Sequence, residues 1–492
     1  MLSRKITALS LASMMALLVS CGDAQSIDTG NTDTVSDSTA AETLSAAIPD
    51  GLNLDGTKVT FLYRETSSPE FYSETATGDV VNDAIYNSFL YVENLLNADI
   101  EVVTRPGDVV GDREEYCGHI RSTVMSGDSS YDWVDTLIGL FPGLAVEGLF
   151  SDLNENQYIN FDAPYWIAGQ TESCAPTGKL YFASGDSSLG YLKSAYCLFF
   201  NTTLANTIGT EDIYQLVLDG KWTLDKLLEV SASAAGDIDG DGEWTLDDRI
   251  GFAVHDFTHP RAFLFSTGGQ LFGADGDSWT FTYGSERDID VVEKLNKLFY
   301  ETDGSYYYNG SNAISDQVEG YNKVTSAFTS GKILFMTAEF DHAVSQLRAM
   351  NDNYGIIPCP KYSEEDDYRT VSRSTHNAFA LLKTSGNTDA AGAVLEALSA
   401  YKYKTVLPAY FEVALKTKYS RDDTTSQMCD IIRDSMVLDF GFVFNNELGN
   451  PIVTVFEPSF NNPTSMSSTI ASQKQTIETK IEDFLGKLAE VE

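Results

Sequence analysis

Residues 58–64 read KVTFLYR, a run of β-branched and aromatic residues that favours a strand. Residues 82–97 follow with four apolar side chains spaced by 4, 3 and 4, which predicts a helix with one apolar face. Residues 99–105 predict a second strand, residues 112–127 a second helix and residues 132–138 a third strand. This β-α-β-α-β order predicts an α/β lobe with a parallel sheet.

The length and charge of the chain exclude several classes of protein. Its 492 residues are enough for two lobes, because single hydrophobic cores rarely grow beyond ~250–300 residues. It carries 72 acidic against 32 basic residues, a net charge of −40. Binding to nucleic acid or to anionic lipid needs a basic surface, so we expect neither partner.

The N-terminus predicts export. Arg4 and Lys5 precede an uncharged stretch over residues 6–20, which is too short to span a membrane and predicts a signal peptide over residues 1–20. The sequence around Cys21 resembles a bacterial lipobox, so we expect Cys21 to be lipidated and to anchor the protein to the membrane. The alternative is an ordinary cleaved signal with an incidental cysteine.

Residues 21–50 predict a flexible acidic tether behind this anchor. Residues 22–50 contain six acidic residues, nine Ser or Thr and no Lys or Arg. They show no apolar period, and their like charges favour an extended chain.

The cysteines beyond Cys21 do not suggest a metal site. They are Cys117, Cys174, Cys197, Cys359 and Cys429. Five is an odd number, so they cannot all pair with one another, and no CxxC or Cys/His spacing typical of zinc occurs. We expect buried free thiols, with one disulfide as the alternative.

Residues 237–248 fit a calcium loop of the EF-hand type. Such a loop needs oxygen ligands at positions 1, 3, 5, 7, 9 and 12, with glycine at position 6, which is Gly242 here. The expected ligands are Asp237, Asp239, Asp241, the Glu243 carbonyl, Thr245 and Asp248. Aspartate at position 12 is shorter than the usual glutamate, which leaves magnesium as an alternative. A further alternative is an acidic turn whose carboxylates do not converge.

Motifs of several enzyme classes are missing. No GxGxxG follows the first predicted strand, and GxxxxGK[ST], GxSxG and HExxH do not occur in the chain. Glycoside hydrolysis needs two carboxylates on either side of the bond that is cleaved. With 72 acidic residues in the chain, their number alone does not exclude such a pair.

Four further segments carry a family resemblance. Residues 220–228 (GKWTLDKLL) precede the acidic loop, residues 327–332 (AFTSGK) precede a predicted strand, and residues 354–358 read YGIIP. Residues 408–421 resemble a segment found in a large subgroup from Gram-positive anaerobes. Together with the lipobox, tether and α/β alternation, they resemble the family-1, sugar-type extracellular solute-binding proteins of ABC importers over nearly the whole mature chain.

The resemblance implies a two-lobe α/β fold of the periplasmic-binding-protein type, which closes on a ligand held between the lobes. The first lobe would comprise residues 51–184 and 375–430, and the second residues 185–372 and 435–492. It also implies ABC permease subunits as partners, a monomer, and a position on the outer face of the bacterial cell membrane.

Ten candidate ligand-binding residues follow from the rule that ligands of α/β lobes meet the carboxyl ends of strands and the segments that cross between lobes. They are Arg64, Glu65, Gly139, Phe141, Asp186, Glu339, Phe340, Asp341, Thr375 and His376. The resemblance adds Phe257 and His259, in a segment similar to one that supplies a cleft aromatic in sugar-binding relatives. Sugar-binding relatives often show Trp where this chain has His259, which leaves ring stacking open at that position. The alternatives are a surface ion pair at Arg64 and Glu65, a packed strand end at Glu339 and Phe340, and ordinary loop histidines.

The sequence therefore predicts a binding protein and not an enzyme. We expect a lipid-anchored extracytoplasmic receptor that captures a carbohydrate, an oligosaccharide in particular, and delivers it to an ABC importer. The 25 Tyr, 27 Phe and 5 Trp permit an aromatic sugar site without requiring one. The alternatives are an anchored carbohydrate-active enzyme and a surface sensor or adhesin with the same fold.

Overall fold

A computed structural model describes residues 44–45, 47–275, 278–307, 317–416 and 423–491. The predicted signal peptide, Cys21 and most of the predicted tether lie outside the described residues. Within the described part of the chain, no helix is both long and apolar enough to cross a membrane.

The first sheet has four strands in the order β11-β3-β1-β2. The strands are β1 (Thr57–Arg64), β2 (Ala98–Arg105), β3 (Trp133–Leu137) and β11 (Asn377–Leu381). β1 runs parallel to β2 and β3, and β11 runs antiparallel to β3. With α1 (Val80–Leu96) and α2 (Arg113–Met125) between its strands, this unit confirms the predicted β-α-β-α-β order. We call it the first lobe.

Local chemistry explains where α1 begins. The side chain of Asp79 accepts hydrogen bonds from the backbone N–H groups of Val81 and Asn82, so it satisfies donors that an uncapped helix would leave free. The helix therefore starts two residues before the predicted Asn82. Its apolar face, which includes Ile85 and Phe89, is buried as predicted.

The second sheet has five strands in the order β10-β4-β9-β5-β8. They are β4 (Tyr196–Asn201), β5 (Ile250–Val254), β8 (Ser305–Tyr307), β9 (Ile333–Glu339) and β10 (Tyr354–Ile357). β5 is parallel to β8 and β9, whereas β4 is antiparallel to β9 and β10. A small antiparallel pair, β6 (Phe272–Asp275) and β7 (Ser278–Phe281), stands apart. We call the second sheet and its helices the second lobe.

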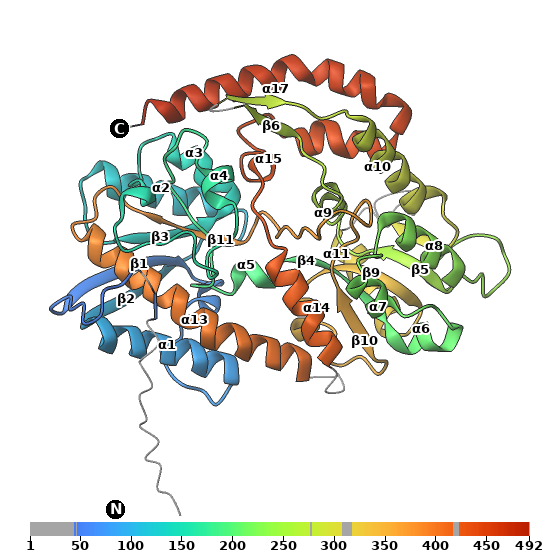
Figure 1. The fold of residues 1–492 in the computed structure, drawn as a ribbon, viewed down its shortest axis with the longest axis horizontal. Helices are drawn as coiled ribbons and strands as arrows, with labels where there is room; N and C mark the ends of the chain where they lie inside the picture. Colours follow the sequence, from blue (N-terminus) through green and yellow to red (C-terminus); the bar gives the residue numbers. More distant parts are fainter. Residues whose placement is uncertain (1–43, 46, 276–277, 308–316, 417–422, 492) are drawn as a thin grey trace, which may run out of the picture. The chain divides into compact units, whose positions relative to one another are not determined.

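Helices of very different lengths surround the sheets (Figure 1). The longer ones are α8 (Leu224–Ala234), α10 (Glu286–Asn296), α11 (Gln317–Thr329), α13 (Thr388–Lys416), α14 (Asp423–Asp434) and α17 (Met466–Ala489). The short ones are α3 (Phe141–Ala145), α4 (Gln170–Cys174), α5 (Gly190–Lys193), α6 (Thr202–Ile208), α7 (Ile213–Leu218), α9 (Pro260–Ser266), α12 (His342–Ser345), α15 (Phe440–Val443) and α16 (Glu457–Asn461).

Within the described residues, three segments that pass between the two lobes lie side by side. Ala195, which leads from α5 into β4, pairs with Ser372 ahead of β11. Thr370 in turn pairs with Met436, which follows α14. We call these the first, second and third crossing segments. Because segments far apart in sequence meet here, this is where a hinge between the lobes would bend.

The C-terminal helix α17 and the residue beyond it contact two separate parts of the molecule. It packs against β7, and its buried residues Ile477, Ile481 and Leu488 form one stripe. Just beyond the helix, the Val491 carbonyl accepts a hydrogen bond of 2.7 Å from Nζ of Lys179 in the first lobe. In Figure 1, α17 runs along the top of the view towards the C-terminus.

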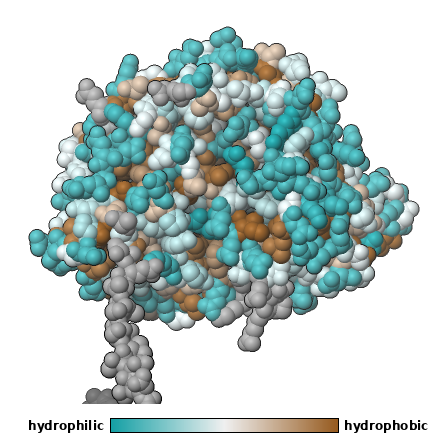
Figure 2. Space-filling view, in the orientation of Figure 1, coloured by the Kyte–Doolittle hydropathy of each residue, from teal (hydrophilic) through white to brown (hydrophobic). Residues whose placement is uncertain are grey.

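The five cysteines of the described chain are buried and unpaired, as predicted. Burial raises the pKa of each thiol, so they behave as small apolar side chains and not as nucleophiles. On the face shown in Figure 2, hydrophilic residues cover most of the surface and hydrophobic residues form separate patches, in keeping with the net charge of −40.

Candidate functional site: the boundary between the lobes

The first-lobe edge is built around a buried arginine. Arg64 ends β1, and its guanidinium lies 2.9 Å from Oδ2 of Asp135 and 2.9 Å from Oδ1 of Asp108. Tyr116 donates a further hydrogen bond of 3.1 Å to Asp135. Burial raises the pKa of Asp135 to about 6 even beside the Arg64 charge. Both carboxylates bind Arg64, so this network holds the lobe edge together.

This geometry corrects the expectation for Arg64. Its side chain is 3% exposed, so it is neither the surface ion pair that the sequence left open nor a free ligand-binding group. The neighbouring Glu65 is exposed, and its backbone N–H donates to the Arg105 carbonyl.

The second-lobe edge carries a looser cluster of charges. Glu339 ends β9, and its Oε1 accepts a hydrogen bond of 3.0 Å from Arg373 of the second crossing segment. Arg373 also lies 3.8 Å from Asp256, which follows β5, and His259 Nε2 lies 3.6 Å from Glu339. Burial alone would raise the pKa of Glu339, but His259 and Arg373 outweigh burial and lower it. Arg373 keeps 31% of its side chain exposed.

Four of the five histidines lie at this boundary. His259 Nδ1 is 2.8 Å from the Thr337 hydroxyl, and the His255 ring lies 4.7 Å from that of His342 and 5.7 Å from that of His259. Burial lowers the pKa of His255 and His342, and it lowers that of His376 to about 4. These three rings are therefore neutral at pH 7 and can donate or accept hydrogen bonds.

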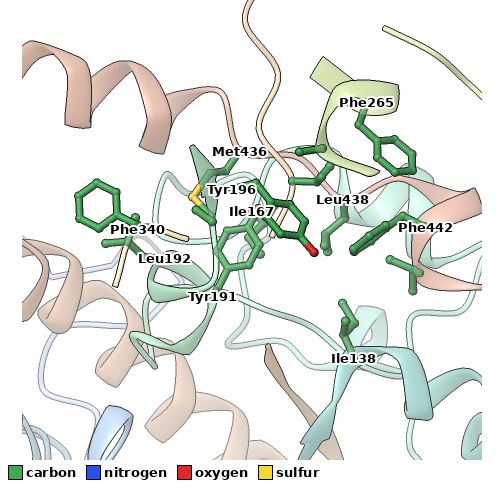
Figure 3. Close-up of a cluster of buried hydrophobic side chains, with 14 of the residues drawn as sticks. Ile138, Ile167, Tyr191, Leu192, Tyr196, Phe265, Phe340, Met436, Leu438 and Phe442 are labelled. Carbon is green, nitrogen blue, oxygen red and sulfur yellow. The ribbon is translucent and has the colours of Figure 1, made fainter. Parts of the chain in front are cut away.

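Several buried polar atoms at the boundary have no hydrogen-bond partner in the described structure. They include Tyr191 Oη, His376 Nε2, His259 Nε2, His255 Nδ1 and Asn377 Oδ1. Tyr191 belongs to α5 in the first crossing segment, and its ring meets the edge of the His376 ring at 5.0 Å. Figure 3 shows the Tyr191 ring among apolar side chains that include Ile138 and Phe442. Since buried polar groups are nearly always paired, this concentration of unpaired groups suits a site that receives a polar partner.

The remaining candidates fall into two groups. Phe141 and Phe340 are fully buried, Phe141 stacked on Phe182 and Phe340 packed against Tyr410, so both belong to hydrophobic cores and not to a ligand surface. This placement corrects the expectation for both rings, because an aromatic residue after a strand can turn inward as readily as outward.

The other candidates stay near the crossing segments. Asp186 forms a buried ion pair with Arg433, which fixes the start of the first crossing segment. The Gly139 N–H donates to the Ser374 carbonyl at 3.4 Å, next to the half-buried Thr375. Phe257 is partly buried beside Asp256 and within 6.0 Å of the Arg261 guanidinium.

Sequence reasoning missed four residues of this boundary, namely Tyr191, Lys193, Tyr196 and Arg373. None follows the carboxyl end of a strand: Tyr191, Lys193 and Arg373 lie within crossing segments, and Tyr196 begins β4. Lys193 lies 2.8 Å from Glu70 of the first lobe and 3.4 Å from Asp341 of the second. A search for charged residues beside predicted lobe crossings would have found Lys193 and Arg373.

The acidic loop at 237–248 brings three of its six expected ligands together. Asp237, Asp239 and Asp248 each offer a carboxylate oxygen, and these oxygens lie within 4.8 Å of one another. Asp237 accepts hydrogen bonds from the N–H groups of Gly240 and Gly242, both of which have a positive φ that glycine adopts without strain. An all-oxygen donor set of carboxylates fits a hard cation such as calcium. The Asp241 carboxylate is not part of this group.

Two α/β lobes joined by crossing segments, with unpaired polar groups at their boundary, are the architecture of a two-lobe binding-protein fold. The family described as bacterial extracellular solute-binding protein matches residues 97–405, and the chain belongs to that family. No curated protein matches the chain.

Solved structures agree with this fold. The sugar-binding protein MalE of Xanthomonas citri superposes with a TM-score of 0.60 at 12% identity, over 88% of this chain and 100% of that one. MalE of Listeria monocytogenes in complex with maltose gives 0.55 at 12%, over 89% and 98%. A substrate-binding protein of the same organism in complex with cycloalternan gives 0.52 at 15%, over 88% and 100%. The family and these structures are binding proteins, and the chain is likewise not an enzyme.

Proposed function

We propose that this protein is the receptor of an ABC importer and captures an oligosaccharide between its two lobes. Its family consists of solute-binding proteins, and similar structures are those of proteins that bind maltose, maltotetraose and cycloalternan. At 12–15% identity those structures support the fold, so the ligand class must rest on the chemistry of the site.

The observation that carries the proposal is the set of unpaired polar atoms at the lobe boundary. The Tyr191 hydroxyl and the His376 ring nitrogen are neutral groups that can each donate or accept one hydrogen bond, and the His259 ring nitrogen offers a further polar atom. A sugar presents many hydroxyls that do the same, together with apolar C–H faces that pack on aromatic rings. Arg373 and Glu339 add a charged pair whose exposed parts can bind further hydroxyls.

The test is a ligand screen with a matched pair of tyrosine variants. Thermal shift of the mature protein would be recorded with maltose, maltotetraose, cycloalternan, amino acids and short peptides. We expect a glycan to raise the melting temperature, since it binds only the folded state. Tyr191→Phe should lose most of that shift, whereas Tyr283→Phe should keep it, because Tyr283 is an equally buried, unpaired hydroxyl packed against Phe456.

A peptide or amino-acid hit would contradict the carbohydrate assignment while leaving the receptor role intact. Hydrolysis of a bound glycan would contradict the receptor role itself. If Tyr191→Phe and Tyr283→Phe lose the ligand-induced rise in melting temperature equally, the ligand does not bind at the boundary around Tyr191.

We also propose that Cys21 is lipidated and that the acidic tether holds the lobes outside the membrane, within reach of the permease. The predicted signal peptide and the extracellular family support this arrangement. Radioactive palmitate should label the protein in cells, and Cys21→Ser should lose the label. Deletion of the protein should abolish uptake of its glycan; uptake that persists would favour a sensor.

For the acidic loop we propose a structural calcium ion. Asp237, Asp239 and Asp248 would supply carboxylates, and the Thr245 hydroxyl lies 3.3 Å from an Asp248 oxygen at the same place. The loop closes on itself through its own backbone donors, so the ion would stabilise the turn between α8 and β5 and take no part in ligand binding.

A further inference from the structure

Lys193 is the last residue of α5, and its ammonium group reaches both lobes. Nζ lies 2.8 Å from Oε1 of Glu70, which follows β1, and 3.4 Å from Oδ1 of Asp341, which follows β9. The two carboxylates therefore come from opposite sides of the boundary and share one cation.

The backbone around Lys193 is divided between the lobes in the same way. The Asp341 N–H donates to the Lys193 carbonyl at 3.0 Å, which attaches this residue to the second lobe. Four residues earlier, the Leu189 N–H donates to the Glu70 carbonyl at 3.0 Å, which attaches the start of α5 to the first lobe. Any rotation between the lobes must therefore act on the short stretch that ends at Lys193.

The charges of this bridge are largely withdrawn from solvent. The side chains of Lys193, Glu70 and Asp341 are 26%, 23% and 30% exposed. Burial lowers the pKa of Lys193, but the two carboxylates outweigh burial and raise it, so the ammonium is charged at neutral pH. Tyr410 of α13 donates a hydrogen bond of 3.2 Å to Asp341 and holds that carboxylate in place.

We propose that Lys193 is a positioning residue for ligand capture, because its bridge sets the equilibrium between the separated and the closed lobes. Separation of the lobes moves Glu70 away from Asp341, and Lys193 can follow only one of them. The bridge therefore favours the lobe arrangement of this structure, in which both carboxylates reach Nζ. A ligand that binds this arrangement binds in proportion to its population, so the bridge also raises the apparent affinity.

The effect of Lys193 on ligand affinity rests on the proposed function, whereas its effect on the lobe equilibrium does not. The test therefore begins with the protein free of ligand. Spin labels on Met125→Cys of the first lobe and Leu218→Cys of the second, both exposed positions, would report the distance between the lobes. The five cysteines of the described residues are buried and should remain unlabelled, and Cys21 is replaced by serine in the labelled protein.

The matched control is Lys226 of α8. Its Nζ also pairs with two carboxylates, Glu211 at 3.0 Å and Glu229 at 2.9 Å, and its side chain is 23% exposed, but all three residues belong to the second lobe. Lys193→Met should add or enlarge a population with a longer label distance, and Lys226→Met should not. Lys193→Arg should restore the original distribution, because it keeps the charge.

With a glycan identified, Lys193→Met should weaken binding roughly fivefold, the effect of losing one partly buried ion pair, and Lys226→Met should leave it unchanged. Identical label distances in the Lys193→Met and Lys226→Met variants would overturn the proposal. The label distance could be longer in Lys193→Met while neither the wild type nor any variant binds a glycan. That result would support the role of the bridge and would contradict the proposed function.

Discussion

At the edge of each lobe one arginine lies between two carboxylates, Arg64 in the first lobe and Arg373 at the second. The Arg64 side chain is 3% exposed, and both of its partners lie at 2.9 Å. The Arg373 side chain is 31% exposed, and its partners lie at 3.0 and 3.8 Å. A closed network of this kind stabilises the lobe that contains it, whereas a loose one can exchange its partners for a ligand.

The comparison extends to the groups around each arginine. Tyr116 bonds to the Asp135 carboxylate beside Arg64. Beside Arg373, the Nε2 atom of His259 lies 3.6 Å from Glu339, too far for a good hydrogen bond. Similar residue types thus give a buried, closely paired network on one side of the boundary and a looser, partly exposed one on the other.

The largest expected effect is the loss of Arg64. Arg64→Met leaves Asp135 and Asp108 without their cation, and breaking a buried ion pair in this way costs about 3–5 kcal/mol. Urea unfolding monitored by tryptophan fluorescence would measure it. Arg105→Met, at the end of the neighbouring strand β2, is the control and should cost less than about 0.5 kcal/mol.

A double variant sharpens this test. Arg64→Met with Asp135→Asn should be more stable than Arg64→Met alone, because it removes the charge that the single variant strands in the core. Equal stability of Arg64→Met and Arg105→Met would mean that the first-lobe network is no more structural than the second.

The next effect is the pH dependence conferred by His376. Its folded pKa of about 4 lies below the ordinary value of 6.5, so the unfolded chain binds this proton first. Neutral His376 therefore contributes about 3 kcal/mol to the unfolding free energy above pH 6.5. This contribution is lost as the pH falls from 6.5 towards 4. His376→Gln should flatten the unfolding free energy between pH 6.5 and 4. Asp135, with its pKa raised to about 6, acts in the opposite sense, which makes the variant comparison necessary.

His119→Gln provides the control for that experiment. His119 is a half-buried residue of α2, away from the crossing segments, and its replacement should change the slope much less. If the unfolding free energy changes with pH equally in the wild type and in His376→Gln, the His376 ring is not held neutral at the boundary.

Calcium should have an intermediate effect. At a concentration 100 times the Kd, an ion that binds only the folded state adds about 2.7 kcal/mol. The melting temperature should therefore rise in calcium and fall in EDTA, and Asp248→Asn should abolish both changes. Asp247→Asn is the control, since Asp247 is exposed and pairs with Lys332 outside the carboxylate group. A wild type that responds to neither calcium nor EDTA would exclude the structural ion.

Sequence patterns predicted the parts of this fold that depend on neighbours in the chain. The apolar spacing of α1 and the runs of β1, β2 and β3 are local, and so is the placement of Glu339 at a strand end. The rule for strand ends therefore placed Glu339 and Asp341 at one side of the boundary, and the family resemblance pointed to His259.

The same rule failed where the outcome depended on distant partners. Whether Arg64 faces a ligand or a core is decided by Asp135, 71 residues later, and Phe340 is buried by a helix that begins near residue 388. Arg373 and Lys193 lie on segments that become neighbours only when three crossings come together. No local period marks such residues.

The smallest effect on stability, and the most informative for function, is expected for Arg373. Arg373→Met removes a partly exposed pair, so it should cost at most about 1 kcal/mol in urea unfolding. Its effect on binding should be larger, roughly tenfold for the loss of a charged hydrogen bond to the ligand. The same glycan titrated by calorimetry into the Arg373→Met and Arg105→Met variants would measure it. A variant that loses stability as strongly as Arg64→Met, with unchanged affinity, would mean that the two edges are alike and that the ligand binds elsewhere.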